Sequence, residues 1–115
     1  MRRGEIRLVD LEPVRGSEAN KRRPAVLVSN DGANTTAQRL GRGVVTVVPI
    51  TSNVAQVHPF QVLPPSDEAG LRKPAKAHAE QVRSIDVDRI GPLVGHLNLA
   101  LLHQLDEALR LHLGL

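Results

Sequence analysis

The sequence predicts a mainly β fold, a small curled barrel or sandwich of about six short strands followed by one C-terminal helix. Short runs rich in Val, Leu and Ile recur between residues 4 and 96, and turn signals of Pro, Gly and Asn separate them. Apolar residues recur with helical spacing only beyond residue 97. The chain has 115 residues and no cysteine. This length suits a single domain, residues 1–115, with an aliphatic core and no disulfide.

Each strand is expected where a short apolar run lies between turn residues. The run at 24–29 favours a buried strand over a helix because it is short and rich in branched side chains. Residues 30–42 are expected to form a long polar loop, since Asn30, Asp31 and Gly32 make a turn signal at its start. The expected strands are residues 4–11, 24–29, 43–51, 59–63, 75–84 and 93–96.

One turn of helix is expected at residues 86–89, and a longer helix closes the chain. Asn98 is a suitable N-cap for the long helix, and Gly114 can end it. Asp106 and Arg110 are spaced to pair on its polar side. Apolar residues at helical spacing form one stripe, which predicts packing on the core or on a partner subunit. The stripe consists of Leu101, Leu102, Leu105, Ala108, Leu109 and Leu113.

The charge is unevenly distributed. The net charge is +3; residues 1–76 carry 12 Lys and Arg against 7 Asp and Glu, and residues 77–115 carry 3 against 5. A basic first part is typical of a protein with a polyanionic partner. Phe60 is the only aromatic residue, which argues against a generic single-strand binder that stacks bases on aromatic rings. No leader-like or membrane-spanning stretch is found, so a cytoplasmic protein is expected.

The basic loop Gly16–Pro24 comes directly before the apolar run Ala25–Val28. Lys21, Arg22 and Arg23 end this loop, and a guanidinium anchored on a strand suits bidentate binding of phosphate oxygens. A solvated basic turn is the alternative interpretation of the same residues.

Metal-dependent chemistry finds little support in the sequence. The carboxylates are scattered singly, and none of the five histidines has metal-ligand spacing, so no metal or cofactor is expected. His96, His103 and His112 are interpreted as surface or structural residues. His58 and His78 remain candidates for acid–base chemistry, because a pair of histidines can cleave RNA.

Polar residues also gather at two predicted strand ends. The segment Thr51–Asn53 closes one strand with hydroxyls and an amide, and Glu80–Ser84 decorates another. Taken singly, each is explained better as a strand terminus or turn cap than as a site. Together with Arg23, they would supply the cations and hydrogen-bond donors that metal-free phosphodiester cleavage requires.

A series of short blocks along the chain resembles the MazF/PemK family of toxin endoribonucleases, over about residues 4–113. The blocks are Gly4-Glu5-Ile6, Asp10-Leu11-x-Pro13, Gly16-Ser17-Glu18, Arg23-Pro24, Val28-Ser29-Asn30-Asp31, Pro49-x-Thr51-Ser52-Asn53, Pro59-Phe60 and Ala79 to Asp86. The resemblance implies an SH3-like, PemK-type barrel with a C-terminal helix, acting as a homodimer. It also implies metal-independent cleavage of single-stranded RNA, leaving 2′,3′-cyclic phosphate and 5′-hydroxyl ends, and inhibition by a cognate antitoxin.

The same resemblance assigns roles to individual positions. Arg23 corresponds to the catalytic arginine and Thr51 to the catalytic threonine. Ser17 and Glu18 fall in the loop that gates the site, and Gln81 matches a residue near the substrate. The residues expected to contact the substrate are Ser17, Glu18, Lys21, Arg22, Ser52, Asn53, Gln81 and Arg83. Arg7 and His58 stand where many relatives carry aromatic residues, which makes the cleavage sequence an open question.

The expected mechanism uses the 2′-hydroxyl of the substrate as nucleophile. Arg23 would stabilise the charge that develops on the phosphate, and Thr51 would donate a hydrogen bond to the same centre. Guanidinium stays protonated in proteins, so the acceptor of the 2′-hydroxyl proton would be Glu18, His58 or water. Two alternatives remain open: a non-enzymatic toxin that blocks a protein such as a topoisomerase, and a degenerate RNA-binding domain.

Overall fold

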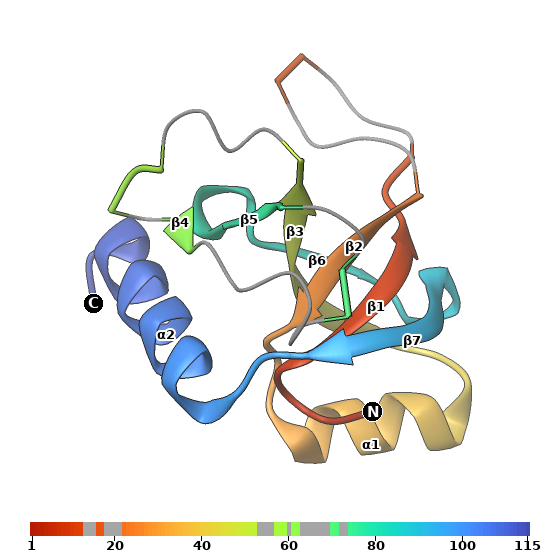
Figure 1. The fold of residues 1–115 in the computed structure, drawn as a ribbon. Helices are drawn as coiled ribbons and strands as arrows, with labels where there is room; N and C mark the ends of the chain where they lie inside the picture. The colour runs from red at the N-terminus through yellow and green to blue at the C-terminus, as the bar shows by residue number, and fades with distance from the viewer. Residues whose placement is uncertain (13–15, 18–21, 53–56, 60, 63–69, 72–73) are drawn as a thin grey trace.

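The computed structural model describes residues 1–12, 16–17, 22–52, 57–59, 61–62, 70–71 and 74–115 (Figure 1). Among these residues, seven strands form one sheet in the order β4-β5-β3-β2-β1-β7, with β6 also paired to β3. The strands are β1 (Glu5–Asp10), β2 (Arg22–Leu27), β3 (Val44–Thr51), β4 (Gln61–Val62), β5 (Lys76–His78), β6 (Arg83–Asp86) and β7 (Ile90–His96). The helical elements are α1 (Asp31–Leu40), η1 (Ala79–Gln81), η2 (Val87–Arg89) and α2 (Leu99–Leu113).

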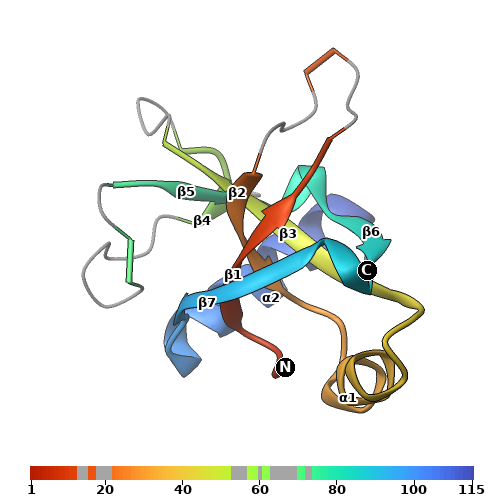
Figure 2. The same cartoon turned by 90° about the vertical axis from the view of Figure 1, so that its right-hand side faces the viewer.

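The sheet is antiparallel and strongly curved, and α2 packs along one side of it (Figures 1 and 2). The mainly β class with a C-terminal helix is therefore confirmed. A ladder between the edge strands β4 and β7, which would close a barrel, is not found among the described residues. No helix in the described part of the chain is long and apolar enough to cross a membrane.

The expected strand at residues 75–84 is interrupted in the structure. It consists of β5, the 3₁₀ turn η1 and the start of β6, and both strands pair with the same edge of β3. Ala77 lies opposite Ile50 and Arg83 lies opposite Val47, so six steps along this segment match only three along β3. The surplus residues form η1, a bulge between β5 and β6, which both run antiparallel to β3.

The prediction of a loop at residues 30–42 is wrong, because ten of these residues form α1. The side chain of Asn30 accepts a hydrogen bond from the backbone N–H of Ala33, so it caps the helix instead of making a turn. Gly41 ends α1 in the left-handed conformation, with φ of 65°. Asn34 is fully buried and donates from its amide to the carbonyl oxygen of Ser29. The hydroxyl of Ser29 in turn accepts from the backbone N–H of Thr46 on β3, so these polar contacts link the helix to the sheet.

The turn expected at residues 86–89 is present as η2, with Asp86 as its cap. The strand expected at 93–96 begins earlier, at Ile90. Of the strand expected at 59–63, Gln61 and Val62 form β4, while Phe60 and Leu63 lie outside the described residues.

Alternate residues of the central strands point into two separate apolar clusters. One cluster lies between the sheet and α2, and includes Ile6, Val26, Val48 and Leu105. The other lies on the opposite face of the sheet. It includes Val9, Ala25, Leu27, Ala37, Val45 and Val47. Because strand side chains alternate between faces, burying both clusters fixes the register of β1, β2 and β3.

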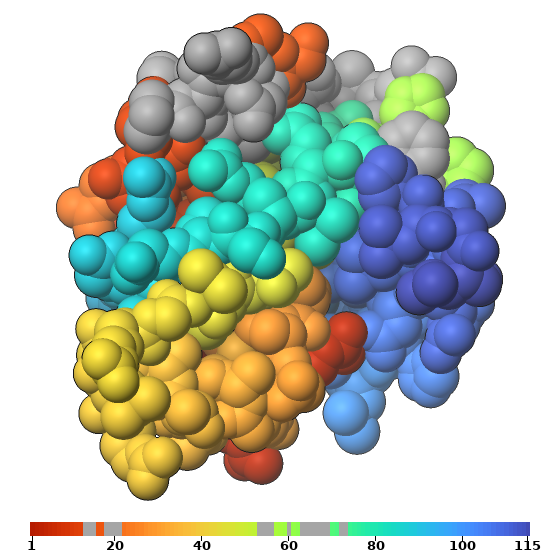
Figure 3. Space-filling model, turned by 180° about the vertical axis from the view of Figure 1, so that it is seen from behind, coloured from red at the N-terminus to blue at the C-terminus, as the bar shows by residue number. Residues whose placement is uncertain are grey.

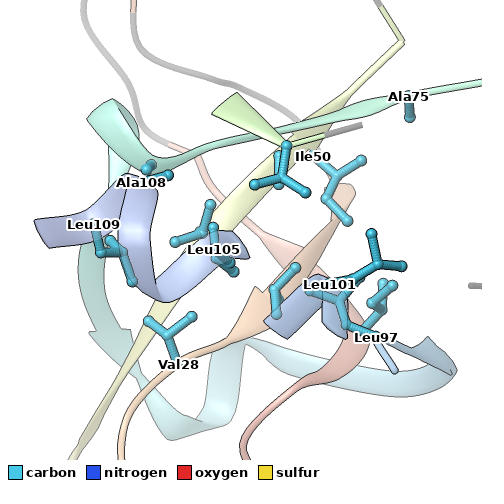
Figure 4. Packing of buried hydrophobic residues seen from close by; sticks show 14 residues of the cluster. Val28, Ile50, Ala75, Leu97, Leu101, Leu105, Ala108 and Leu109 are labelled. Atoms are coloured by element: carbon cyan, nitrogen blue, oxygen red, sulfur yellow. The ribbon is translucent and has the colours of Figure 1, made fainter. Parts of the chain in front are cut away.

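Leu105 lies at the centre of the first cluster, where leucines of α2 point toward β2 and β3 (Figure 4). It is fully buried, so Leu105→Ala is expected to lower the free energy of unfolding by about 2–5 kcal/mol. Urea denaturation of the two proteins measures this difference. Leu99→Ala is the control, because that side chain is 84% exposed on the same helix. A loss for Leu105→Ala no larger than for the control would contradict this packing.

The apolar stripe of α2 is confirmed at Leu101, Leu105, Ala108 and Leu109, which are buried. Leu113 is instead exposed. The expected pairing of Asp106 with Arg110 is also wrong.

Asp106 binds the guanidinium of Arg3 at 2.6 Å, and Arg110 lies 3.4 Å from Glu107. Arg3 also donates its backbone N–H to Asp31 of α1. The N-terminal segment therefore links the two helices, and Figure 3 shows it in red between them. Asp106 therefore pairs with Arg3 of the N-terminal segment and not with Arg110, four residues further along α2.

Candidate active site

An open groove of about 730 Å³ brings together the basic end of β2 and the polar end of β3. Its polar lining comes from Arg22, Arg23, Thr51 and Ser52. Its apolar lining comes from Leu8, Pro24, Ile50, Leu71, Ala75 and Val94, with Gly70 between them. The groove therefore presents two guanidinium-bearing residues and two hydroxyls over an apolar floor, an arrangement suited to a phosphate ester.

The pairing of β2 with β3 explains why Arg23 and Thr51 meet. Ala25 lies opposite Pro49 and Val26 lies opposite Val48 in this antiparallel ladder (Figure 1). Extending this register by two residues would bring Arg23 opposite Thr51, and both residues line the groove. Side chains directly opposite each other lie on the same face of a sheet. The sheet register therefore sets the separation of the two residues.

Gly70 brings a connecting segment against β7 at the edge of this groove. Its φ is 77°, and a Cβ atom there would overlap the carbonyl oxygen of Val94. Only glycine satisfies both demands, the left-handed backbone and the close approach.

The hydroxyl of Thr51 has a partner behind the groove. Its Oγ1 lies 2.6 Å from Nε2 of His78, on the neighbouring strand β5. Nδ1 of the same ring lies 2.6 Å from Oε1 of Glu80. The side chains of His78 and Glu80 are 12% and 23% exposed. The hydrogen-bonded series Thr51–His78–Glu80 is therefore largely shielded from solvent.

Gln61 of β4 holds the carboxylate of Glu80 in place. Its Nε2 donates to both carboxylate oxygens, at 3.1 and 3.2 Å, and its Oε1 accepts from the backbone N–H of His58 at 3.0 Å. Glu80 belongs to the bulge η1, which begins directly after His78.

The predicted substrate residues divide into three groups. Arg22 and Ser52 line the groove beside the predicted catalytic pair. Gln81 donates to the carbonyl oxygen of Ser17 at 3.5 Å, and Arg83 donates to that of Leu11 at 3.3 Å; neither of these donors lines the groove. Glu18, Lys21 and Asn53 lie outside the described residues. The substrate roles of all these residues stay predictions.

Arg7 and His58, which stand where many relatives are expected to carry aromatic residues, have different surroundings. Arg7 forms an ion pair with Glu5 at 3.0 Å and donates to the carbonyl oxygen of Gly91. His58 is half-buried, and its backbone supports Gln61. Within the described ranges, no three His, Asp or Glu side chains are grouped so that they could hold a metal ion.

Sequence reasoning did not connect His78, Glu80 and Gln61 to Thr51. The only available signal was the His78-Ala79-Glu80 spacing at the end of an apolar run. Residues two apart on a strand lie on one face, but this spacing does not predict Gln61 or Thr51 as partners, because those residues belong to other strands.

A family model of the PemK-like, MazF-like toxins of type II toxin–antitoxin systems matches residues 2–113. The chain belongs to this family. The match spans nearly the whole sequence, and the groove that holds Arg23 and Thr51 lies within it. The family expected from the short sequence blocks is thereby confirmed.

Curated relatives of this PemK/MazF-like chain are endoribonucleases. It is 63% identical over 115 residues to endoribonuclease MazF9 of Mycobacterium tuberculosis, covering 100% of this chain and 98% of that protein. It is 29% identical over 116 residues to endoribonuclease EndoA of Bacillus subtilis, covering 100% of this chain and 96% of that one.

Solved structures share the fold. MazF from Deinococcus radiodurans aligns with a TM-score of 0.82 at 26% identity, covering 100% of this chain and 97% of that one. A mycobacterial endoribonuclease in complex with its cognate antitoxin aligns with a TM-score of 0.78 at 23% identity, covering 100% of this chain and 96% of that one. The curved sheet with a C-terminal helix is thus the fold of MazF.

Proposed function

We propose that residues 1–115 form one toxin domain that cleaves single-stranded RNA endonucleolytically without a metal ion. The observation that carries this proposal is the convergence of Arg23 and Thr51 on one groove, beside Arg22 and Ser52. The high identity to a curated endoribonuclease along the full chain supports it. A protein that only blocked a partner would have no need of this paired arrangement.

The reaction starts from the substrate's own 2′-hydroxyl, which attacks the adjacent phosphorus. The attack forms a 2′,3′-cyclic phosphate and expels the 5′-oxygen of the next nucleotide. Negative charge accumulates on the non-bridging phosphate oxygens in the transition state. Arg23 stabilises that charge, since a fixed guanidinium binds two such oxygens and needs no reorganisation during the reaction.

The remaining groove residues position the RNA. Arg22 and Ser52 contact the phosphate backbone on either side of the catalytic pair, and Ser17, Gln81 and Arg83 extend the contact surface. Glu18, Lys21 and Asn53 contribute from the neighbouring segments. Electrostatic contacts of this kind to a phosphate backbone weaken as salt is added.

The partners follow from the family. A cognate antitoxin inhibits this toxin in the cytoplasm by covering the RNA groove, and the toxin acts as a homodimer. Two observations support these partners: the antitoxin complex of the mycobacterial neighbour, and the large exposed leucines on α2, among them Leu99 and Leu111. Light scattering of the purified protein measures the oligomeric state.

Cleavage of a long defined RNA in excess EDTA tests the activity. Cuts at a recurring short sequence, with 5′-hydroxyl and 2′,3′-cyclic phosphate ends, are expected, because the nucleophile belongs to the substrate. Parallel reactions with added Mg²⁺ should give the same cuts. Cleavage that requires Mg²⁺ would contradict the metal-free mechanism. No cleavage by folded, antitoxin-free protein would contradict the enzymatic function and direct the search to a protein target.

A further inference from the structure

We propose that Thr51, His78 and Glu80 form a proton relay in which His78 acts as the base for the 2′-hydroxyl, through the hydroxyl of Thr51. This inference rests on the proposed ribonuclease function and deepens it. Thr51 lines the groove and touches the substrate, while His78 is a positioning and proton-holding residue that acts through Thr51. The relay supplies the proton acceptor that Arg23 cannot be, because guanidinium stays protonated.

The hydrogen-bond network determines which ring nitrogen of His78 carries the proton. Gln61 accepts the backbone N–H of His58 at Oε1, so its amide nitrogen must point toward Glu80. Both carboxylate oxygens of Glu80 accept from this one amide nitrogen, at 3.1 and 3.2 Å. Nδ1 of His78 lies 2.6 Å from that carboxylate and 3.1 Å from the amide nitrogen of Gln61; we assign the proton to Nδ1 because the carboxylate is the closer partner. Nε2 of the neutral ring is then an acceptor.

The direction of the bond between Thr51 and His78 follows. A hydroxyl has one proton to donate, and the nearby Nε2 at 2.6 Å takes it. The oxygen of Thr51 keeps its other lone pair for a donor in the groove. The 2′-hydroxyl of RNA is such a donor. In this state Thr51 cannot give a hydrogen bond to the phosphate, so the relay replaces the donor role that the sequence predicts for it.

The relay moves two protons, one from the substrate and one from Thr51. The 2′-hydroxyl proton moves to Oγ1 of Thr51 while the Thr51 proton moves to Nε2 of His78. The electron pair of the 2′-oxygen forms the new bond to phosphorus, and the bond to the 5′-oxygen breaks with its electron pair on that oxygen. Solvent water protonates the 5′-oxygen. His78 is left as an imidazolium beside Glu80, and returning its proton to solvent restores the resting state.

The surroundings of His78 favour this transient charge. Glu80 is the carboxylate in hydrogen-bond contact with the ring, and the Gln61 amide shares that carboxylate. On its own strand, Lys76 lies two residues away and pairs in register with Thr51. Lys76 is buried and has an interaction partner within the protein. The carboxylate of Glu80, in direct contact with the ring, favours a positive charge on it.

Single-turnover cleavage at saturating protein concentration tests the relay, over a pH series. The variants are His78→Gln, whose amide can still bind Thr51 but cannot take a proton, and Glu80→Gln. His103→Gln, on the exposed side of α2, is the matched control. Circular dichroism melts verify folding, and fluorescence anisotropy measures RNA binding.

The expected loss for His78→Gln is on the order of a hundredfold or more in the cleavage step, with RNA affinity within about threefold of the parent protein. The parent rate should rise with pH to a plateau, because a base must be unprotonated to accept a proton. The variant should lose that plateau and keep rising, because hydroxide then replaces the missing base. Free imidazole should restore cleavage in His78→Ala, in proportion to the imidazole concentration.

The outcomes distinguish a failure of the relay from a failure of the ribonuclease function. If the parent protein cleaves RNA and His78→Gln retains both its rate and its pH profile, the relay is wrong and the ribonuclease function stands. If His78→Ala is slow but imidazole restores nothing and the plateau persists, His78 is only structural and the relay is equally wrong. If the parent protein cleaves no RNA, the ribonuclease function itself fails.

Discussion

Arg23→Ala is expected to slow RNA cleavage by on the order of a hundred- to a thousandfold, the usual cost of removing one preorganised group that stabilises transition-state charge. Arg23 lies near the start of β2 and lines the groove, and its backbone pairs with Val9 of β1. The residue is therefore anchored at the groove before the substrate arrives. Its removal should affect the cleavage step more than RNA binding, because the other cations of the groove remain.

Single-turnover rates on an end-labelled RNA measure the effect, with binding measured separately. Arg23→Lys should recover only part of the rate, since an ammonium is a single point charge and cannot engage two phosphate oxygens at once. Arg39→Ala is the control, because Arg39 is exposed on α1, away from the groove lining. An Arg23→Ala protein that cleaves within about threefold of the parent rate would show that another group carries the charge stabilisation.

Thr51→Val is expected to cause a loss of similar size, on the order of a hundred- to a thousandfold. Valine matches the shape of threonine but has no hydroxyl, so it can neither contact the substrate proton nor pass it to His78. The fold should be retained, because Thr51 is the last residue of β3 and its backbone pairing with Lys76 does not depend on the hydroxyl.

Combining Thr51→Val with His78→Gln distinguishes a relay from two independent contributions. Groups that act as one unit give grossly non-additive losses, so the double variant should be about as slow as the slower single variant. If the losses in cleavage rate of the two single variants multiply in the double variant, Thr51 and His78 act separately. The control is the double variant Thr51→Val with Arg23→Ala. Its two losses in cleavage rate should multiply, because the two residues stabilise different parts of the reaction.

The strand pattern could be predicted because it depends on local chemistry. Branched apolar runs such as 24–29 and 43–51 form β2 and β3 in nearly the expected places. The cap at Asn98 and the break at Gly114 delimit α2 as expected. The prediction failed at residues 30–42. Asn30 and Gly32 suit a turn and a helix start equally well, and the choice is made by burial of Asn34 and Ala37 against the sheet.

The predicted pair Arg23 and Thr51 is brought together by strands β2 and β3, but the sequence alone gave no reason for their proximity. That reason is the antiparallel register of β2 with β3, fixed by apolar side chains such as Val26 and Val48. His78 was a candidate in isolation. Its connection to Thr51 depends on the pairing of β5 with β3, and Glu80 follows in the turn η1.

The sequence by itself determined the fold class, the toxin family, and the two residues at which the chemistry is expected. These follow from residue types, spacing and short blocks, all of which are local. Only the tertiary structure decided the surroundings of the Thr51 hydroxyl, because its partners His78, Glu80 and Gln61 belong to other strands and a turn. Hydrogen bonds between distant segments depend on register and on bulges. Those features are set by the packing of the whole core, not by the residues that form the bonds.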